Sequence, residues 1–188
     1  PMGTVEDAGE KQLLRNAALG DFVVSRKNAP LVKFCLRLLK EGTPAVVLGR
    51  DVSSELSALV QRSKTEDVTK MLEYVEKWKA RELKRILDQN PEADTDRIED
   101  TVACIVAISE GEESVEDVRA KLRTMFDESG DAHRVTLMST HKAKGLEADR
   151  VWLLKDTYTP SKSIEEQNLL YVGITRAKHE LYYVEGVS

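Results

Sequence analysis

The spacing of apolar positions along the chain predicts a sheet whose strands alternate with helices. From Leu31 to Leu39, apolar residues recur at helical spacing, with Asn28 as the expected N-cap and Gly42 as the expected stop. An order of strand, helix, strand and helix is typical of a parallel sheet, so we predict an α/β fold with about five or six strands flanked by helices. Short apolar runs of strand length lie at 21–26, 45–49, 135–139, 151–154 and 180–184.

Two weaker patterns complete the first part of the chain. Residues 1–20 are polar, and we expect only a short helix there, from Lys11 to Leu19. A further helix, capped by Ser53 or Ser54, is expected to run through Val60.

The middle of the chain has a different texture, with helical periodicity and no strand pattern. One amphipathic helix is expected from Val68 to Leu87, and a second from Asp94 or Thr95. Ser114, followed three residues later by an acidic residue, resembles a capping box and opens a third helix that ends by 129–130. We therefore assign 1–63 and 131–188 to the two parts of one α/β domain, and 64–130 to a small all-α insertion.

The net charge of −5 is unevenly distributed. Residues 64–130 contain 11 Lys and Arg against 18 Asp and Glu, whereas the rest of the chain contains 17 against 15. The flanking parts are thus mildly basic, without a polybasic stretch. Any contact with DNA must then depend on a few positioned groups or on a partner domain.

Other features of the composition exclude several classes of protein. No apolar run approaches the length of a membrane span and no signal peptide is visible, so we expect a cytoplasmic protein without a membrane partner. Cys35 and Cys104 lie on apolar helical faces without metal-ligand spacing, which favours buried free thiols and no metal site. The opening residues 1–3 suggest an expression scar or an excised fragment.

Polar residues that follow predicted strands are the candidate chemistry. Residues 140–147, THKAKGLE, come directly after the apolar run 135–139. In open α/β sheets, ligands bind outside the carboxyl ends of the strands. Arg176 follows an apolar helical stretch and precedes the run 180–184, and we expect it to project from the same sheet.

These residues resemble the conserved motifs of UvrD/Rep-type superfamily 1 helicases. Residues 140–147 resemble motif V, and residues 165–178, EEQNLLYVGITRAK, resemble motif VI. Upstream, residues 23–29, VVSRKNA, look like motif IV. The blocks occur in the expected order and spacing. The resemblance implies the C-terminal RecA-like domain (2A) of such a helicase, with the helical insertion corresponding to a much reduced 2B subdomain.

The resemblance also implies roles for individual residues at an ATP site. Arg176 matches the arginine finger, and Arg26 a second sensor of the γ-phosphate. Glu147 matches the carboxylate that accepts a hydrogen bond from the nucleotide ribose. A planar, permanently charged guanidinium suits the charge that develops on the γ-phosphoryl oxygens. We expect Arg26, Glu147 and Arg176 to converge on one edge of the sheet.

A second group of residues matches positions close to single-stranded DNA. Thr140 and His141 correspond to motif V positions near the DNA backbone, and Lys144 supports that loop. Structural interpretations remain open for several residues. Arg26 could form a strand-end ion pair, Glu147 could stabilise its loop, and His141 could link two loops by a hydrogen bond.

The chain contains only part of an ATP site. No G-x-x-x-x-G-K-[S/T] sequence and no strand-terminal Asp-Glu pair occur in it. By resemblance, ATP and Mg²⁺ belong to the intact enzyme, and an N-terminal RecA-like P-loop domain is the missing partner. We expect the chain alone neither to hydrolyse ATP nor to unwind DNA.

The form Lys144-Gly145-Leu146-Glu147 looks like the 3′-to-5′ branch of these helicases. Two alternatives remain open. One is a non-catalytic module that keeps the fold to bind DNA or a protein. The other is the motor domain of a helicase-nuclease.

Overall fold

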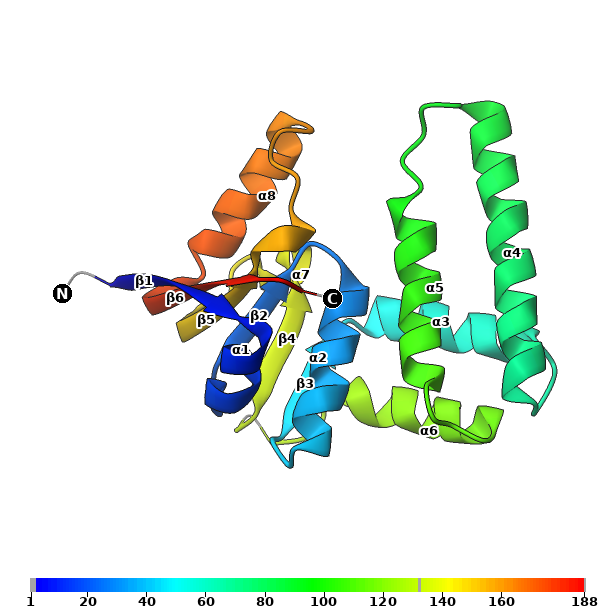
Figure 1. The fold of residues 1–188 in the computed structure, drawn as a ribbon, viewed down its shortest axis with the longest axis horizontal. Coiled ribbons are helices and arrows are strands. Elements are labelled where there is room, and N and C mark those ends of the chain that lie inside the picture. Colours follow the sequence, from blue (N-terminus) through cyan, green and yellow to red (C-terminus); the bar gives the residue numbers. More distant parts are fainter. Residues whose placement is uncertain (1–2, 132, 188) are drawn as a thin grey trace. The chain divides into compact units, whose positions relative to one another are not determined.

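The computed structural model describes residues 3–131 and 133–187. The chain divides into two compact units (Figure 1). Pro1–Gly49 and Asp127–Ser188 form a sheet unit, and Arg50–Phe126 forms a helical unit.

The sheet unit contains a six-stranded, all-parallel sheet in the order β1-β6-β5-β2-β4-β3. The chain therefore begins on one edge of the sheet and enters its centre at β2. The strands are β1 (Thr4–Gly9), β2 (Phe22–Ser25), β3 (Ala45–Leu48), β4 (Val135–Ser139), β5 (Ala148–Leu154) and β6 (Ala177–Glu185).

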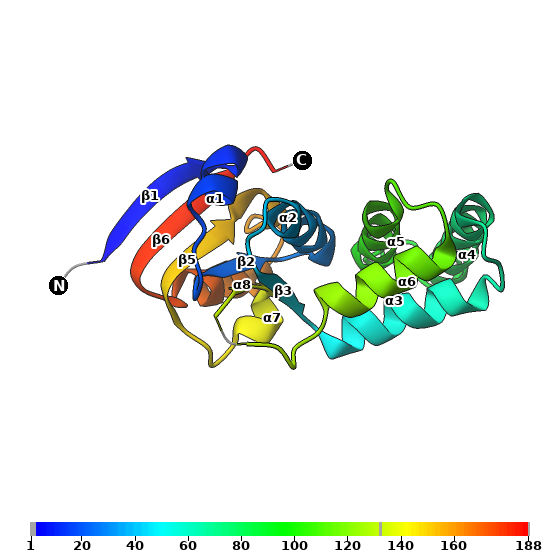
Figure 2. The same ribbon diagram turned by 90° about the horizontal axis from the view of Figure 1, so that it is seen from below.

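Helices cover both faces of this sheet, as an all-parallel sheet requires. On one face lie α1 (Glu10–Asn16) and α2 (Asn28–Lys40), and on the other lie α7 (Thr140–Ala143) and α8 (Ile164–Ile174), as Figure 2 shows. A short 3₁₀ helix, η1 (Lys155–Thr157), follows β5. The predicted α/β, RecA-like fold is confirmed.

The five predicted strands all form, and the structure adds a sixth. Strand β1 lies in the segment for which only a short helix was expected, because five of its six residues are exposed and it has no apolar face that would reveal it. It pairs with β6 in parallel, from Thr4 opposite Glu180 to Gly9 opposite Glu185. The predicted helix of this segment is shorter than expected, ending at Asn16.

Several predicted boundaries also shift. Helix α2 has Lys27, not Asn28, as its N-cap. Helix α3 (Arg50–Arg62) begins three residues before the expected Ser53 cap. The residues directly after β4, for which no helix was predicted, form the short helix α7, whose N-cap Ser139 accepts a hydrogen bond from the backbone N–H of Lys142.

The helical unit consists of α3, α4 (Val68–Gln89), α5 (Asp96–Ser109) and α6 (Val115–Met125). The three helices expected in this segment form. Ser114 caps α6, accepting from the backbone N–H of Asp117 at 3.1 Å, as the capping box predicts. The Ser114 hydroxyl also donates to the Asp117 carboxylate at 2.6 Å. That helix ends at Met125, before the expected stop at 129–130. Helix α3, assigned from the sequence to the first part of the α/β domain, packs with α4, α5 and α6.

Both cysteines are free and buried, as expected. Burial raises the pKa of Cys35 to about 12 and raises that of Cys104 as well, so both thiols stay protonated. In the described part of the chain, no helix has the length and apolar character needed to cross a bilayer.

Candidate functional site

The carboxyl ends of β2 and β4 bring two predicted site segments together. Ser25 lies opposite Ser139 in the parallel register, so Arg26 and Thr140 are the next residues of adjacent strands. The polar side chains that follow these strands therefore meet at the carboxyl edge of the sheet.

Arg26 is held at this edge from two directions. Its backbone N–H donates to the Thr157 hydroxyl at 3.0 Å. Its Nε donates to Glu166 Oε1 at 2.8 Å, with the Arg26 side chain 31% exposed and that of Glu166 11% exposed. This is the strand-end ion pair that the sequence left open as an alternative for Arg26.

Thr140 anchors the turn after β4 from inside the protein. It is fully buried, and its hydroxyl contacts the Ser25 carbonyl and the Tyr158 hydroxyl. Burial raises the pKa of Tyr158, so its hydroxyl stays protonated. The side chain of Thr140 thus has no surface to offer DNA, and it positions the residues that follow it.

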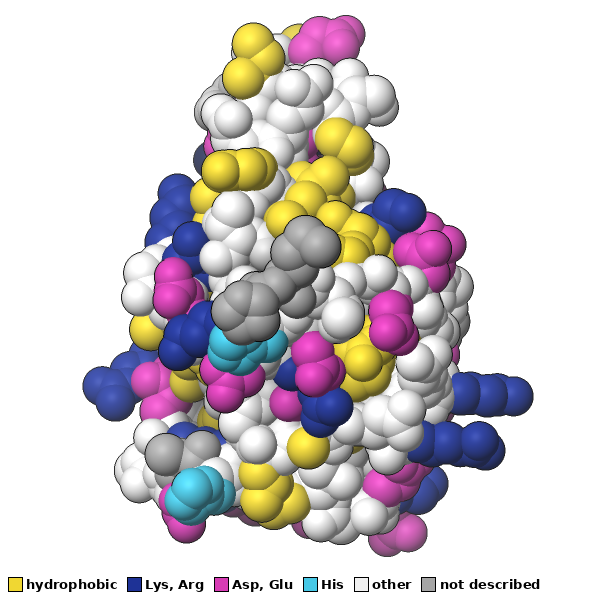
Figure 3. Space-filling model, turned by 90° about the vertical axis from the view of Figure 1, so that its left-hand side faces the viewer, with side chains coloured by type: hydrophobic (Ala, Val, Ile, Leu, Met, Phe, Trp, Pro, Cys, Tyr) yellow, Lys and Arg dark blue, Asp and Glu magenta, His cyan; other side chains and the backbone are white. Residues whose placement is uncertain are grey.

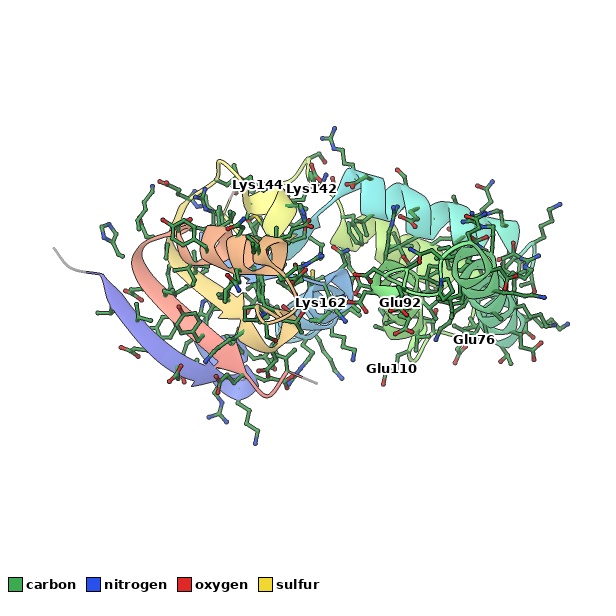
Figure 4. The ribbon with its side chains drawn as sticks, turned by 90° about the horizontal axis from the view of Figure 1, so that it is seen from above. Glu76, Glu92, Glu110, Lys142, Lys144 and Lys162 are labelled. Carbon is green, nitrogen blue, oxygen red and sulfur yellow. The ribbon has the colours of Figure 1, made fainter. Side chains whose placement is uncertain are left out.

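His141 and Lys144, by contrast, are exposed on the surface of α7 and the residue after it. Figure 4 labels Lys142 and Lys144 beside this short helix. Partial burial, with Arg26 and Lys144 nearby, lowers the pKa of His141 below 6.5, despite the opposing effect of Glu165 and Glu166. His141 is therefore neutral at pH 7 and lies within electrostatic range of the Arg26–Glu166 pair.

Glu147 and Arg176 lie at the opposite, amino edge. Ala148, the first residue of β5, is in register with Ala177, the first residue of β6. The residues just before these strands are consequently neighbours. Glu147 is exposed there, and the N–H of Ala148 donates to the Arg176 carbonyl at 3.1 Å.

The Arg176 guanidinium ties the end of α8 to the loop before β5. Nε donates to the Val172 carbonyl at 3.0 Å, Nη1 to the Leu146 carbonyl at 3.2 Å and Nη2 to the Thr175 hydroxyl at 3.0 Å. All of these acceptors are neutral oxygens. The guanidinium is therefore oriented without its charge being cancelled.

The expectation that Arg26, Glu147 and Arg176 share one edge is wrong. Arg26 follows a strand, whereas Glu147 and Arg176 precede strands of the same parallel sheet. Helix α8 runs between the two edges, and the helical rise separates Glu166 from Ile174, the last residue of α8, by roughly 12 Å. The structure thus brings together Arg26, Thr140 and His141 at one edge, and Glu147 and Arg176 at the other.

Comparison with known proteins agrees with this arrangement of motifs. A family model, described as the UvrD-like helicase C-terminal domain, matches residues 39–185. The chain belongs to this family. A curated relative is the ATP-dependent DNA helicase PcrA of Bacillus subtilis (strain 168), which is 44% identical over an alignment of 66 positions that covers 30% of this chain and 9% of that protein. This UvrD-like domain therefore matches only a small fraction of the length of that relative.

An acidic residue that sequence reasoning missed organises the amino edge of the UvrD-like domain. Asp21 is 5% exposed, and one of its oxygens, Oδ2, accepts three hydrogen bonds. The donors are the backbone N–H of Ala18 at 2.9 Å, Nε of Arg150 at 2.9 Å and Nε1 of Trp152 at 2.8 Å. The sequence did contain a signal for Asp21, because it stands at the start of an apolar run. An Asp beside a buried strand is itself buried only when it has hydrogen-bond or ion-pair partners.

Trp152 and Tyr182 pack within the sheet of the UvrD-like domain. Their rings stack with centroids 4.3 Å apart and planes 17° apart. Trp152 is 1% exposed, so its ring packs in the core.

Charge on the β1–β6 side of the UvrD-like domain is mixed. Figure 3 shows Lys and Arg interspersed with Asp and Glu over this face. Within residues 3–131 and 133–187, no group of three or more His, Cys, Asp or Glu side chains could hold a metal ion. The candidate functional sites are therefore the two clusters described above, one at the carboxyl edge of the sheet and one at the amino edge.

Proposed function

We propose that this chain is the C-terminal motor domain of an ATP-dependent DNA helicase or translocase. In this proposal it works with an N-terminal RecA-like P-loop domain and single-stranded DNA. The observation that carries the proposal is the contact between Arg176 and Leu146. It joins the motif VI arginine to the motif V loop that carries Glu147.

The amino edge is the proposed nucleotide-facing surface. Arg176 would act as the arginine finger and Glu147 would accept a hydrogen bond from the ribose. ATP bound with Mg²⁺ by the partner domain supplies the phosphoryl group whose transfer loads negative charge onto its oxygens. Arg176 fits this task because its guanidinium is oriented by neutral acceptors and can exchange them for phosphate oxygens.

The carboxyl edge is the proposed DNA-facing surface. His141 and Lys144 are exposed there, and Thr140 fixes the turn from which they project. The position of Arg26 beside them favours contact with a DNA phosphate over the second γ-phosphate sensor that motif IV implies. The motor domain would then bind ATP at the amino edge of the sheet and single-stranded DNA at the carboxyl edge.

Two finer assignments belong to the same proposal. The Lys144-Gly145-Leu146-Glu147 form favours 3′-to-5′ movement. Residues 1–63 and 131–188 would be the two parts of the 2A domain and 64–130 a reduced 2B insertion, although helix α3 clusters with the insertion helices.

Reconstitution of ATP hydrolysis tests the proposal. The purified chain alone should release no phosphate from ATP, with or without DNA, in a malachite-green assay. Addition of the N-terminal P-loop domain of the same enzyme should give DNA-stimulated release. Release by the chain alone, or none from the mixture, would contradict the proposal. The second outcome, with DNA binding retained, would favour a non-catalytic DNA-binding module.

A further inference from the structure

In the Arg26–Glu166 pair, one buried carboxylate oxygen of Glu166 makes no hydrogen bond to the described residues. Glu166 is 8% exposed, and its Oε1 accepts from Arg26 Nε at 2.8 Å. Among the described residues, its second oxygen, Oε2, is buried without a hydrogen-bond partner. A buried carboxylate with only part of its acceptor capacity satisfied is unfavourable for stability. Its presence points to a role other than holding the domain together.

The geometry of the pair indicates what that role is. Glu166 engages Arg26 through Nε, and the two terminal nitrogens of that guanidinium donate no hydrogen bond to any described residue. Those nitrogens form the fork that binds two oxygens of one phosphate. The guanidinium is therefore fixed at its inner side, with its outer side open at a surface where the Arg26 side chain is 31% exposed.

The elements that meet here make the arrangement rigid. The backbone of Arg26 is held by Thr157, and the Ser25 hydroxyl contacts the same Thr157 oxygen at 3.2 Å. On the carboxylate side, the backbone N–H of Glu166 donates to the N-cap Ser163 hydroxyl at 3.2 Å. Both partners of the ion pair thus have their main chains fixed by side-chain hydrogen bonds.

We propose that Glu166 is a positioning residue that orients the Arg26 guanidinium as a two-pronged clamp for a backbone phosphate of single-stranded DNA. The inference rests on the proposed function, because it takes the carboxyl edge to be the DNA-facing surface. It assigns a favourable role in DNA binding to a negatively charged side chain. Charge alone would give Glu166 the opposite effect, since a carboxylate repels phosphate.

The positioning role and simple repulsion therefore predict opposite effects of removing Glu166 on DNA affinity, and the experiment measures which one occurs. Binding of the full 188-residue chain to a labelled oligo-dT strand is measured by fluorescence anisotropy at fixed low salt. Glu166→Ala should weaken binding about tenfold, as expected for losing the alignment of one charge-assisted contact. The matched control is Glu165→Ala, one residue earlier and exposed. It should bind equally well or more tightly, because it only removes a negative charge.

Two further variants separate positioning from charge and from folding. Glu166→Gln keeps an oxygen that can accept from Arg26 Nε and should stay within about threefold of the parent chain. Arg26→Lys leaves Glu166 intact and keeps the positive charge but not the fork, and it should lose about tenfold. The Arg26→Lys measurement remains decisive if Glu166→Ala does not fold.

The outcomes distinguish this inference from the proposed function. If the parent chain binds oligo-dT and Glu166→Ala or Arg26→Lys binds as tightly as the parent, the positioning role is wrong while the DNA-facing surface stands. Equal losses for Glu166→Gln and Glu166→Ala would also overturn it. If the parent chain shows no binding, both the DNA-facing surface and the clamp are wrong.

Discussion

At the scale of single residues, Asp21 is the charged group on which the amino edge most depends. Its Oδ2 joins the turn before β2 to two side chains of β5. Trp152 is 1% exposed, so water cannot replace Asp21 as the acceptor of its N–H. The loop carrying Glu147 leads directly into β5, so Asp21 also steadies the proposed nucleotide-facing surface.

Asp21→Ala should lower the free energy of unfolding by about 2 kcal/mol, because it leaves the Trp152 N–H buried without an acceptor and removes the ion-pair partner of Arg150 Nε. Urea denaturation followed by circular dichroism measures the change. Asp149→Ala is the matched control, since the Asp149 side chain is 79% exposed, and it should change stability by less than about 0.5 kcal/mol. Similar changes in the free energy of unfolding for the two variants would show that the hydrogen bonds of Asp21 contribute little to stability.

If the carboxyl edge is the DNA-facing surface as proposed, we expect His141 to make its DNA binding depend on pH. Burial and neighbouring cations lower its pKa, so in the free chain this group favours folding above pH 6.5 and loses that contribution as the pH falls through its lowered pKa. A bound phosphate would favour the protonated ring. DNA binding should therefore take up a proton and strengthen as the pH falls below 7.

The comparison of His141→Gln with the parent isolates this effect. Anisotropy titrations with oligo-dT between neutral and mildly acidic pH should show the parent gaining affinity and His141→Gln gaining less. His179→Gln is the control, because the His179 side chain is 60% exposed on β6. A pH dependence unchanged in His141→Gln would mean that His141 does not meet the DNA.

The motifs singled out candidate residues, but the spatial grouping expected for them was wrong. Arg26 follows a strand, and Arg176 precedes one. In a parallel sheet these positions lie at opposite edges, and the order of elements along the chain already contained that information. Glu166 could not be singled out, because only its burial against Arg26 distinguishes it from the exposed Glu165.

At the scale of elements, α8 connects the two edges of the sheet. Glu166 in its first turn holds Arg26, and Val172 in its last turn holds Arg176. The distance of α8 from the sheet depends on Gly173. A Cβ atom there would lie 2.7 Å from Leu153 Cδ1 and 3.2 Å from the Tyr158 hydroxyl oxygen.

Gly173→Ala should therefore lower stability by about 1–3 kcal/mol, despite the better helix propensity of Ala, since the added methyl group overpacks a buried contact. Thermal unfolding measures this. Asn168→Ala, exposed on the same helix, should be neutral or slightly stabilising. A stabilised Gly173→Ala would mean that α8 does not pack against β5 as described.

Elements with a clear apolar pattern were predicted well, and the others were not. The central strands β2 and β4 are buried, and their apolar runs identified them. Strand β1 is held mainly by backbone pairing with β6, so its side chains carry no signal. Helix α7 is a single turn, too short for a period to appear.

At the scale of the whole molecule, the sheet unit separates two proposed tasks. ATP would be sensed at the amino edge through Arg176 and Glu147, and DNA held at the carboxyl edge through Arg26, His141 and Lys144. Helix α8 contacts both clusters through Glu166 and Val172. A rigid element joining two sites is the physical basis on which the state of one could bias the other.

The most direct test of this separation compares Arg176→Ala with Arg26→Ala in the motor reconstituted with its P-loop domain. DNA-stimulated kcat and the Kd for oligo-dT are measured for both. Arg176→Ala should lower kcat at saturating DNA by about 10³ or more with little change in Kd. Arg26→Ala should weaken DNA binding with kcat at saturating DNA nearly unchanged. If both variants lose kcat alike and bind DNA alike, the two edges do not have separate functions and the account is wrong.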